Sequence, residues 1–163
     1  MNIKKADTDA DIQRIADLAD IIWHEHFTPI IGIDQVEYML DKFQSYRAIS
    51  EAVKNDGYVY YMAYENDELC GYCGIRPETG GDVFISKVYV ESSHRKKGIA
   101  RRLIETVKSE YPDPGKLYLT VNRHNDGPIA VYKKLGFYIA KEQKADIGNG
   151  FVMDDYVMEF IKR

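Results

Sequence analysis

The strongest chemical signal in this 163-residue chain is a short basic loop around one glycine. The loop consists of Arg95, Lys96, Lys97, Gly98, Ile99 and Ala100. Arg101 and Arg102 follow directly, and no acidic residue lies between Ser92 and Ile104. Because the whole chain has a formal net charge of −4, this local excess of positive charge predicts a polyanionic ligand. Charge alone would fit a solvated helix face equally well.

The place of this loop between an expected strand and an expected helix indicates what the anion is. The first turn of a helix offers unpaired backbone N–H groups and the positive end of the helix dipole. Gly98 lets the backbone approach an anion without a β-carbon in the way. The loop therefore fits a pyrophosphate, with Arg101 or Arg102 near a further phosphate. The patterns G-x-x-x-x-G-K-S/T and G-x-G-x-x-G are absent, which excludes a Walker loop and a dinucleotide fold.

The apolar pattern predicts the elements that must position the loop. Val83–Val90 is a nearly continuous apolar run, which suits a central strand covered on both faces. Helical spacing runs from Ile99 to Val107, before Pro112 and Pro114, and again over 129–135, where Gly136 stops the helix. Other strands are expected at residues 1–6, 58–64, 69–75, 117–121, 137–144 and 151–161, the last two joined around Gly148-Asn149-Gly150.

Two helices are expected near the N-terminus. Thr8 begins the first with a capping-box pattern, and Thr28-Pro29 ends it, because the residue before a proline avoids the helical region. The second begins at Asp34, where Glu37 completes a similar box, and runs to Val53. The order β-α-α-β-β-β-α-β-α-β-β then predicts an α/β chain of the α+β type, with a mixed sheet between two layers of helices.

The composition is that of an ordinary globular protein, with 45% hydrophobic and 29% charged residues. The length predicts a single domain over residues 1–163. A polar N-terminus and the lack of an apolar run of about 20 residues predict a cytoplasmic protein without a membrane partner. The acidic net charge argues against nucleic acid as a partner.

The candidate metal ligands form only weak patterns. Cys70 and Cys73 are a single C-x-x-C pair, and side chains three residues apart on a strand point to opposite faces, so buried strand cysteines are expected. His24 and His26 are two residues apart and would not share a helix face. We expect no metal site.

Two segments together resemble the GNAT family of N-acetyltransferases. Val88–Ala100 is similar to that family's acetyl-CoA motif, an apolar strand followed by Arg/Gln-x-x-Gly-x-Gly/Ala. Val121–Phe137 is similar to its V-N-x-x-N…Y-x-x-x-G-F segment, with Asn125 and Tyr132 at matching positions. The expected element order also agrees along essentially the whole chain. The resemblance implies a GNAT fold, with a mostly antiparallel sheet of six or seven strands, helices on both faces and splayed central strands.

The same resemblance implies transfer of an acetyl group from acetyl-CoA to a primary amine by direct attack on the thioester, without a metal. The backbone N–H of Val88 would donate to the acetyl carbonyl, where an oxyanion develops. Tyr89 and Val90 would lie beside the cofactor, and backbone groups of Val90 would pair with the pantetheine amides. Tyr132 would protonate the departing thiolate, since a phenol of pKa about 10 is neutral at pH 7. Asn125 would bind the pantetheine arm.

Alternatives stay open for several of these roles. Tyr132 could serve only to pack its helix, and Asn125 could act as a helix N-cap. The general base does not carry over, because Phe84 stands where histone-type members have a glutamate. Glu25, His26 and Glu37 are weak candidates, and a base acting through water or an acceptor that arrives neutral would also suffice.

The acceptor is the least determined part of the function. By resemblance, the apolar loop Phe27–Gly32 between the first two helices should border its cleft. Residues 23–45 distantly resemble the helical hairpin of polyamine-acetylating members, which favours a small cationic amine. A protein amine remains open, and Ile30 and Ile31 would equally suit a homodimer contact. Two other functions stay possible: an acyl-CoA sensor without catalysis, which Phe84 favours, and an interaction protein whose basic loop binds another phosphate ligand.

Overall fold

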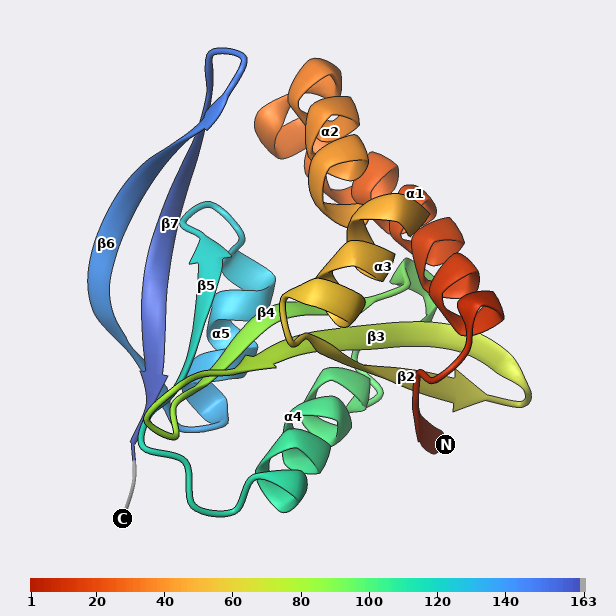
Figure 1. The fold of residues 1–163 in the computed structure, drawn as a ribbon. Helices are drawn as coiled ribbons and strands as arrows, with labels where there is room; N and C mark the ends of the chain where they lie inside the picture. The colour runs from red at the N-terminus through yellow and green to blue at the C-terminus, as the bar shows by residue number, and fades with distance from the viewer. Residues whose placement is uncertain (162–163) are drawn as a thin grey trace.

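A seven-stranded sheet forms the centre of the protein, with helices on both of its faces (Figure 1). A computed structural model describes residues 1–161. The strand order is β1-β2-β3-β4-β5-β7-β6, and in this part of the chain β4–β5 is the one parallel pair. The expected mixed, mostly antiparallel sheet is thereby confirmed. The strands are β1 (Asn2–Lys5), β2 (Val59–Glu65), β3 (Glu68–Pro77), β4 (Val83–Val90), β5 (Leu117–Asn122), β6 (Phe137–Gly148) and β7 (Phe151–Phe160).

The helices divide between the two faces of the sheet and form two apolar cores. One core lies between the sheet and α1, α2 and α3, and the other lies between the sheet and α4 and α5. A π-helical turn, η1, follows α2, and a short 3-10 turn, η2, follows β4. The bounds are α1 (Asp9–Ile31), α2 (Ile33–Met39), η1 (Leu40–Gln44), α3 (Tyr46–Asn55), η2 (Ser92–His94), α4 (Ile99–Glu110) and α5 (Asp126–Lys134).

The two parallel strands at the centre separate after only three paired residues. Val83–Ile85 pairs with Leu117–Leu119, and beyond this point β4 stays with β3 while β5 stays with β7. A bulge at Ser86 accompanies the separation, because Gly74 pairs with Lys87 whereas the next residue of β3 pairs with Ile85. The expected splay of the central strands is confirmed, and it leaves a gap in the sheet between β4 and β5.

The first helix continues through Pro29, so the predicted end at Thr28-Pro29 is wrong. Proline removes one intrahelical hydrogen bond, but Phe27 is buried and Ile31 packs against the core on the same side. This packing outweighs the tendency of the residue before a proline to avoid the helical conformation. Gly32 ends the helix instead, with a φ of 86° and its N–H 2.9 Å from the Thr28 oxygen. Phe27–Gly32 is therefore mainly the last turn of α1 and not a loop.

The second predicted helix is interrupted at Ser45. Apolar spacing continues across this residue, but its backbone is extended, with φ −75° and ψ 160°. Its hydroxyl accepts a hydrogen bond of 3.1 Å from the Ala48 N–H, as an N-cap serine does. The predicted capping box at Asp34 is also wrong, since Gly32 occupies the N-cap of α2 and makes no side-chain cap.

Both cysteines are buried on β3 without a disulfide, as expected, but their predicted orientation is wrong. Cys70 and Cys73 belong to the same apolar core, the one beneath α4 and α5. The pairing of β2 with β3 skips Cys70, and this bulge breaks the alternation of side chains along β3.

Several local predictions are confirmed. The Thr8 hydroxyl accepts a hydrogen bond of 3.1 Å from the Asp11 N–H at the start of α1. Gly136 has the left-handed backbone, with a φ of 99°, that its position after α5 requires. The final hairpin turns at Gly148-Asn149-Gly150, all three with positive φ. Among residues 1–161, no helix has the length and apolar character needed to cross a membrane.

Candidate active site

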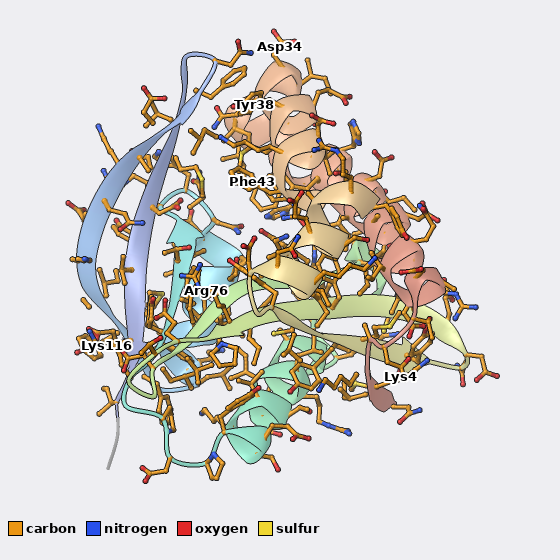
Figure 2. The ribbon with its side chains drawn as sticks, viewed as in Figure 1. Lys4, Asp34, Tyr38, Phe43, Arg76 and Lys116 are labelled. Atoms are coloured by element: carbon orange, nitrogen blue, oxygen red, sulfur yellow. The ribbon has the colours of Figure 1, made fainter. Side chains whose placement is uncertain are left out.

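A cavity of about 730 Å³ opens where β4 and β5 separate, on the face covered by α1, α2 and α3. Four of the sequence-predicted site residues line it: Val88, Tyr89, Asn125 and Tyr132. Phe43 of η1 and Arg76 of β3, both labelled in Figure 2, line it from the helical layer and from the sheet. The sheet gap and the helical layer thus form one continuous site.

The backbone N–H of Val88 points into the gap between the central strands. The Glu91 N–H donates to the Cys70 oxygen of β3 at 2.8 Å. Because successive N–H groups of a strand point to opposite edges, the N–H of Val88, three residues earlier, points away from β3. On that edge the pairing with β5 has already ended at Ile85. The donor therefore lies on the open edge that an oxyanion site requires.

Tyr132 on α5 is buried, with 6% of its surface exposed, and still lines the cavity. Its ring lies 6.2 Å from that of Phe137 in an edge arrangement, and both belong to the core beneath α4 and α5. Burial raises the pKa of its phenol well above the ordinary value, and the neighbouring Cys73 adds to this shift. The hydroxyl is therefore protonated at neutral pH.

Asn125 occupies the N-cap position of α5 without capping it through its side chain. Its Oδ1 oxygen lies 2.6 Å from Nε2 of His26 on α1. The side chain of Asn125 is buried and lines the cavity, and this bond joins the helical layer to α5.

The basic loop lies outside this cavity, at the start of α4. The predicted residues that do not line the cavity are Val90, Arg95, Lys96, Lys97, Gly98, Ile99, Ala100 and Arg101. Gly98 is exposed and left-handed, with a φ of 79°, and no atom lies within 4 Å of where a Cβ would be. It begins α4 without a side-chain cap, so the first N–H groups of the helix remain available to an anion.

The side chains of the loop differ in their exposure and in whether they already have a partner within the protein. Arg95, Lys96 and Lys97 are all exposed, and Arg95 donates from Nε to the Val90 oxygen at 3.3 Å. The Arg101 guanidinium forms an ion pair of 2.8 Å with Glu105 one turn later. The Ile99 side chain is buried in the core, which leaves only its backbone for a ligand.

None of the three weak candidates for the general base lines the cavity. Glu25 accepts a hydrogen bond of 3.0 Å from the Ser92 hydroxyl on the exposed surface. Glu37 pairs with Nε2 of His24 at 2.7 Å, and this contact raises the pKa of His24. Nε2 of His26 is engaged with Asn125. Phe84, which replaces the expected glutamate, lines the cavity and stacks on Tyr118 at 5.0 Å between ring centroids.

Sequence reasoning missed the two buried charged residues that face this cavity, Lys87 and Asp155. Lys87 is 8% exposed and donates to the Tyr60 hydroxyl and the Phe43 oxygen, and burial lowers its pKa to about 7. The sequence could have indicated Lys87, because it is the one charged residue in the apolar run Val83–Val90. Asp155 is 4% exposed, but in the sequence it is one of two adjacent aspartates, and only the strand's orientation distinguishes it from Asp154.

Apolar side chains of the helical layer form the opposite wall. Trp23, Phe27 and Ile31 of α1 line the cavity, and the Trp23 and Phe27 rings lie 4.3 Å apart. The β6–β7 hairpin closes against α2, where the Tyr38 hydroxyl donates to the Ile147 oxygen at 2.6 Å (Figure 2). The expected apolar wall is present, although a helix and not a loop provides it. Within residues 1–161, no group of three or more His, Cys, Asp or Glu side chains is placed to hold a metal.

Comparison with known proteins gives consistent results. The model of the acetyltransferase (GNAT) family matches residues 15–137. An L-2,4-diaminobutyric acid acetyltransferase from Marinococcus halophilus is 38% identical over 78 residues, so the match spans 45% of this chain and 45% of that protein. The structure of the PaiA N-acetyltransferase from Thermoplasma acidophilum, in complex with coenzyme A, has a TM-score of 0.77 at 18% identity, over 98% of this chain and 99% of that one. An aminoglycoside 6'-acetyltransferase type Ii has a TM-score of 0.65 at 26% identity, over 100% and 99% of the two chains.

Proposed function

This chain belongs to the acetyltransferase (GNAT) family, and we propose that it is an enzyme that transfers the acetyl group of acetyl-CoA to a primary amine of a small molecule. One observation carries this proposal. The free edge of β4 at Val88, the phenol of Tyr132 and the amide of Asn125 meet at a single cavity. These groups are what thioester aminolysis needs: a donor for the carbonyl oxygen and an acid for the leaving thiolate.

The proposed place of acetyl-CoA follows the strand β4 toward α4. Its pyrophosphate lies at the open N-terminus of α4, where Gly98 permits close approach and Arg95, Lys96 and Lys97 supply positive charge. Its pantetheine arm lies in the gap beside Tyr89 and Val90, where the backbone of Val90, which faces away from β3, pairs with its amides, and the Asn125 amide adds a further contact. A structure of similar fold, from Thermoplasma acidophilum, contains coenzyme A, which supports this assignment.

In the proposed reaction the amine nitrogen attacks the acetyl carbonyl carbon and the carbon–sulfur bond breaks. The Val88 N–H stabilises the negative charge that develops on the oxygen, an effect worth several kcal/mol at such sites. Tyr132 gives its proton to the sulfur, and burial keeps its phenol protonated at neutral pH.

We favour a small cationic amine as acceptor. The apolar wall of Trp23, Phe27 and Ile31 suits an alkyl chain, and the acidic net charge of the protein attracts a cation. Two amine classes deserve the first trials: polyamines, which the helical hairpin suggested, and diamino acids, which the name of the Marinococcus halophilus relative suggests.

A coenzyme A sensor without catalysis is the second candidate function, and Phe84 is the observation that favours it. Its ring stacks against Tyr118 and lines the cavity where a carboxylate base would be expected. An enzyme needs a base from another position or an acceptor that arrives neutral, whereas a sensor needs neither.

The deciding experiment measures release of free thiol from acetyl-CoA with spermidine, 2,4-diaminobutyrate, an aminoglycoside and a lysine-containing peptide. Turnover with a small amine, together with mass-spectrometric detection of the acetamide, is the expected result. Micromolar coenzyme A binding without turnover on any amine would favour the sensor. A protein that fails to bind coenzyme A in calorimetry would contradict both functions.

A further inference from the structure

A buried carboxylate without a partner faces the candidate active site. Asp155 of β7 is 4% exposed and lines the cavity. Within residues 1–161 its carboxylate makes no hydrogen bond and no ion pair, and burial followed by the charge of Asp154 raises its pKa to about 6. Burying a carboxylate without compensation destabilises a protein. Such a group is therefore a candidate for function when it faces a cleft.

The strand pairing places Asp155 beside the gap that holds the reacting groups. Its backbone pairs with Asn122, the last residue of β5, and with Gln143 of β6, and both of these side chains also line the cavity. Across the gap stands Tyr89, the neighbour of Val88. Burial, followed by the charges of Tyr132 and Asp155, raises the pKa of Tyr89, so Asp155 lies within electrostatic reach of the strand that carries the oxyanion donor.

The charged groups around Asp155 leave its negative charge uncompensated. Directly after β5, Arg123 is engaged with Asp154 at 3.4 Å and with Glu142 of β6. On β4, Lys87 is held by the Phe43 oxygen and the Tyr60 hydroxyl. Asp154 precedes it on β7, Lys144 of β6 lies opposite Asp154 in the strand register, and the phenols of Tyr89 and Tyr156 are further titratable neighbours.

We propose that Asp155 binds the ammonium group of the acceptor and removes the proton that must leave before the nitrogen can attack. This inference rests on the proposed acetyl transfer and names the acceptor class, a primary amine that enters as a cation. One ammonium proton moves to the Asp155 carboxylate and then to solvent. The free amine forms the new carbon–nitrogen bond, the carbon–sulfur bond breaks, and the thiolate takes the Tyr132 proton. The second proton lost by the nitrogen restores Tyr132.

This assignment explains two features together. It supplies a base although Phe84 occupies the expected position and Glu25, His26 and Glu37 lie outside the cavity. It also explains why a carboxylate is buried without a partner, because the acceptor's ammonium is the missing counter-charge. A carboxylate that is ionised at pH 7 but has a raised proton affinity is suited to this task.

The test compares Asp155→Asn with Asp154→Asn, a change of the adjacent aspartate on the other face of β7. With the fastest acceptor of the amine panel, Asp155→Asn should lower kcat/KM at pH 7 by about 100-fold or more, the range of general-base catalysis. Coenzyme A affinity should stay within about twofold, which also shows that the variant is folded. For the native chain, kcat/KM should rise with pH through about 6, and this rise should vanish in Asp155→Asn.

Asp154→Asn should retain most of the activity and shift the midpoint of this rise downward, since Asp154 contributes to the raised pKa of Asp155. Asp155→Glu should recover part of the rate. Native activity in Asp155→Asn, or an equal loss of coenzyme A affinity, would overturn the inference while leaving the proposed function intact. If the native chain turns over no amine, both the proposed function and the base role of Asp155 are wrong. Spermidine binding by calorimetry then decides whether Asp155 holds a cation, with weaker binding by Asp155→Asn expected.

Discussion

The Nε2 nitrogen of His26 on α1 lies 2.6 Å from the Oδ1 oxygen of Asn125 at the start of α5. A carbonyl oxygen only accepts hydrogen bonds, so the His26 Nε2–H donates. Within residues 1–161 the Asn125 amide nitrogen makes no hydrogen bond, so both of its N–H groups remain for a ligand. The bond links the helical layer, whose apolar side chains line the cavity, to the helix that carries Tyr132. Residues 99 positions apart in the chain thus fix one polar group of the cavity.

Breaking this bond should weaken coenzyme A binding without unfolding the protein. His26→Phe keeps the edge contact with Phe27, at 4.8 Å between ring centroids, but loses the donor. We expect a five- to tenfold rise in the Kd of coenzyme A, about 1 kcal/mol, as for a typical hydrogen bond. His24→Phe is the control, because His24 pairs with Glu37 outside the cavity. Combining His26→Phe with Asn125→Ala should add little to Asn125→Ala alone, and full additivity would contradict the role of the pair.

Tyr132→Phe should separate chemistry from binding. The ring and its packing against Phe137 are kept, and only the hydroxyl is lost. If the phenol protonates the thiolate, kcat should fall by about 100-fold or more, while the Kd of coenzyme A changes by less than about threefold. Steady-state kinetics and calorimetry measure the two quantities. A parallel loss of affinity and rate would indicate that the hydroxyl only positions the ligand or the helix.

Gly98→Val tests the anion site, and Gly150→Val, at a glycine with the same backbone conformation, is its control. Gly98 and Gly150 both have a φ of 79° and no atom within 4 Å of a built Cβ. Valine at either position should destabilise the fold by about 1–2 kcal/mol, because a β-branched residue is strained in the left-handed region. Only Gly98→Val should also weaken coenzyme A binding, by tenfold or more, since its Cβ obstructs approach to the α4 N-terminus. Equal coenzyme A affinity in the two variants would place the pyrophosphate elsewhere.

The sequence predicted the sheet well because its signals are local. Alternation, glycine turns and caps such as Thr8 act within a few residues, and the structure agrees with them. The errors occurred where packing at long range outweighed a local preference. Phe27 and Ile31 hold α1 helical across Pro29, and bulges at Cys70 and Ser86 change the faces to which later side chains point.

The acceptor side could not be read from the sequence for a related reason. Whether Asp154 or Asp155 faces the cavity depends on the register of β7 against β5, and a shift of one residue would exchange them. The bond between His26 and Asn125 likewise depends on how α1 crosses the sheet. The basic loop, by contrast, is contiguous in sequence, so its residues stay together in any fold.

The stability of Asp155→Asn should depend on pH in a way that separates a functional carboxylate from a structural one. The pKa of Asp155 is about 6 in the folded protein and ordinarily 3.8. The folded state therefore holds the proton more tightly, and the native chain loses stability as the pH rises from about 4 through 6. Above pH 6, Asp155→Asn should be more stable than the native chain by up to about 2–3 kcal/mol, and this difference should disappear near pH 4. Urea unfolding at pH 4, 5.5 and 7.5 measures it. A variant that is less stable at pH 7.5 would mean that the carboxylate supports the fold. A variant that gains stability as it loses turnover would mean that the site keeps an unfavourable charge for the acceptor to neutralise.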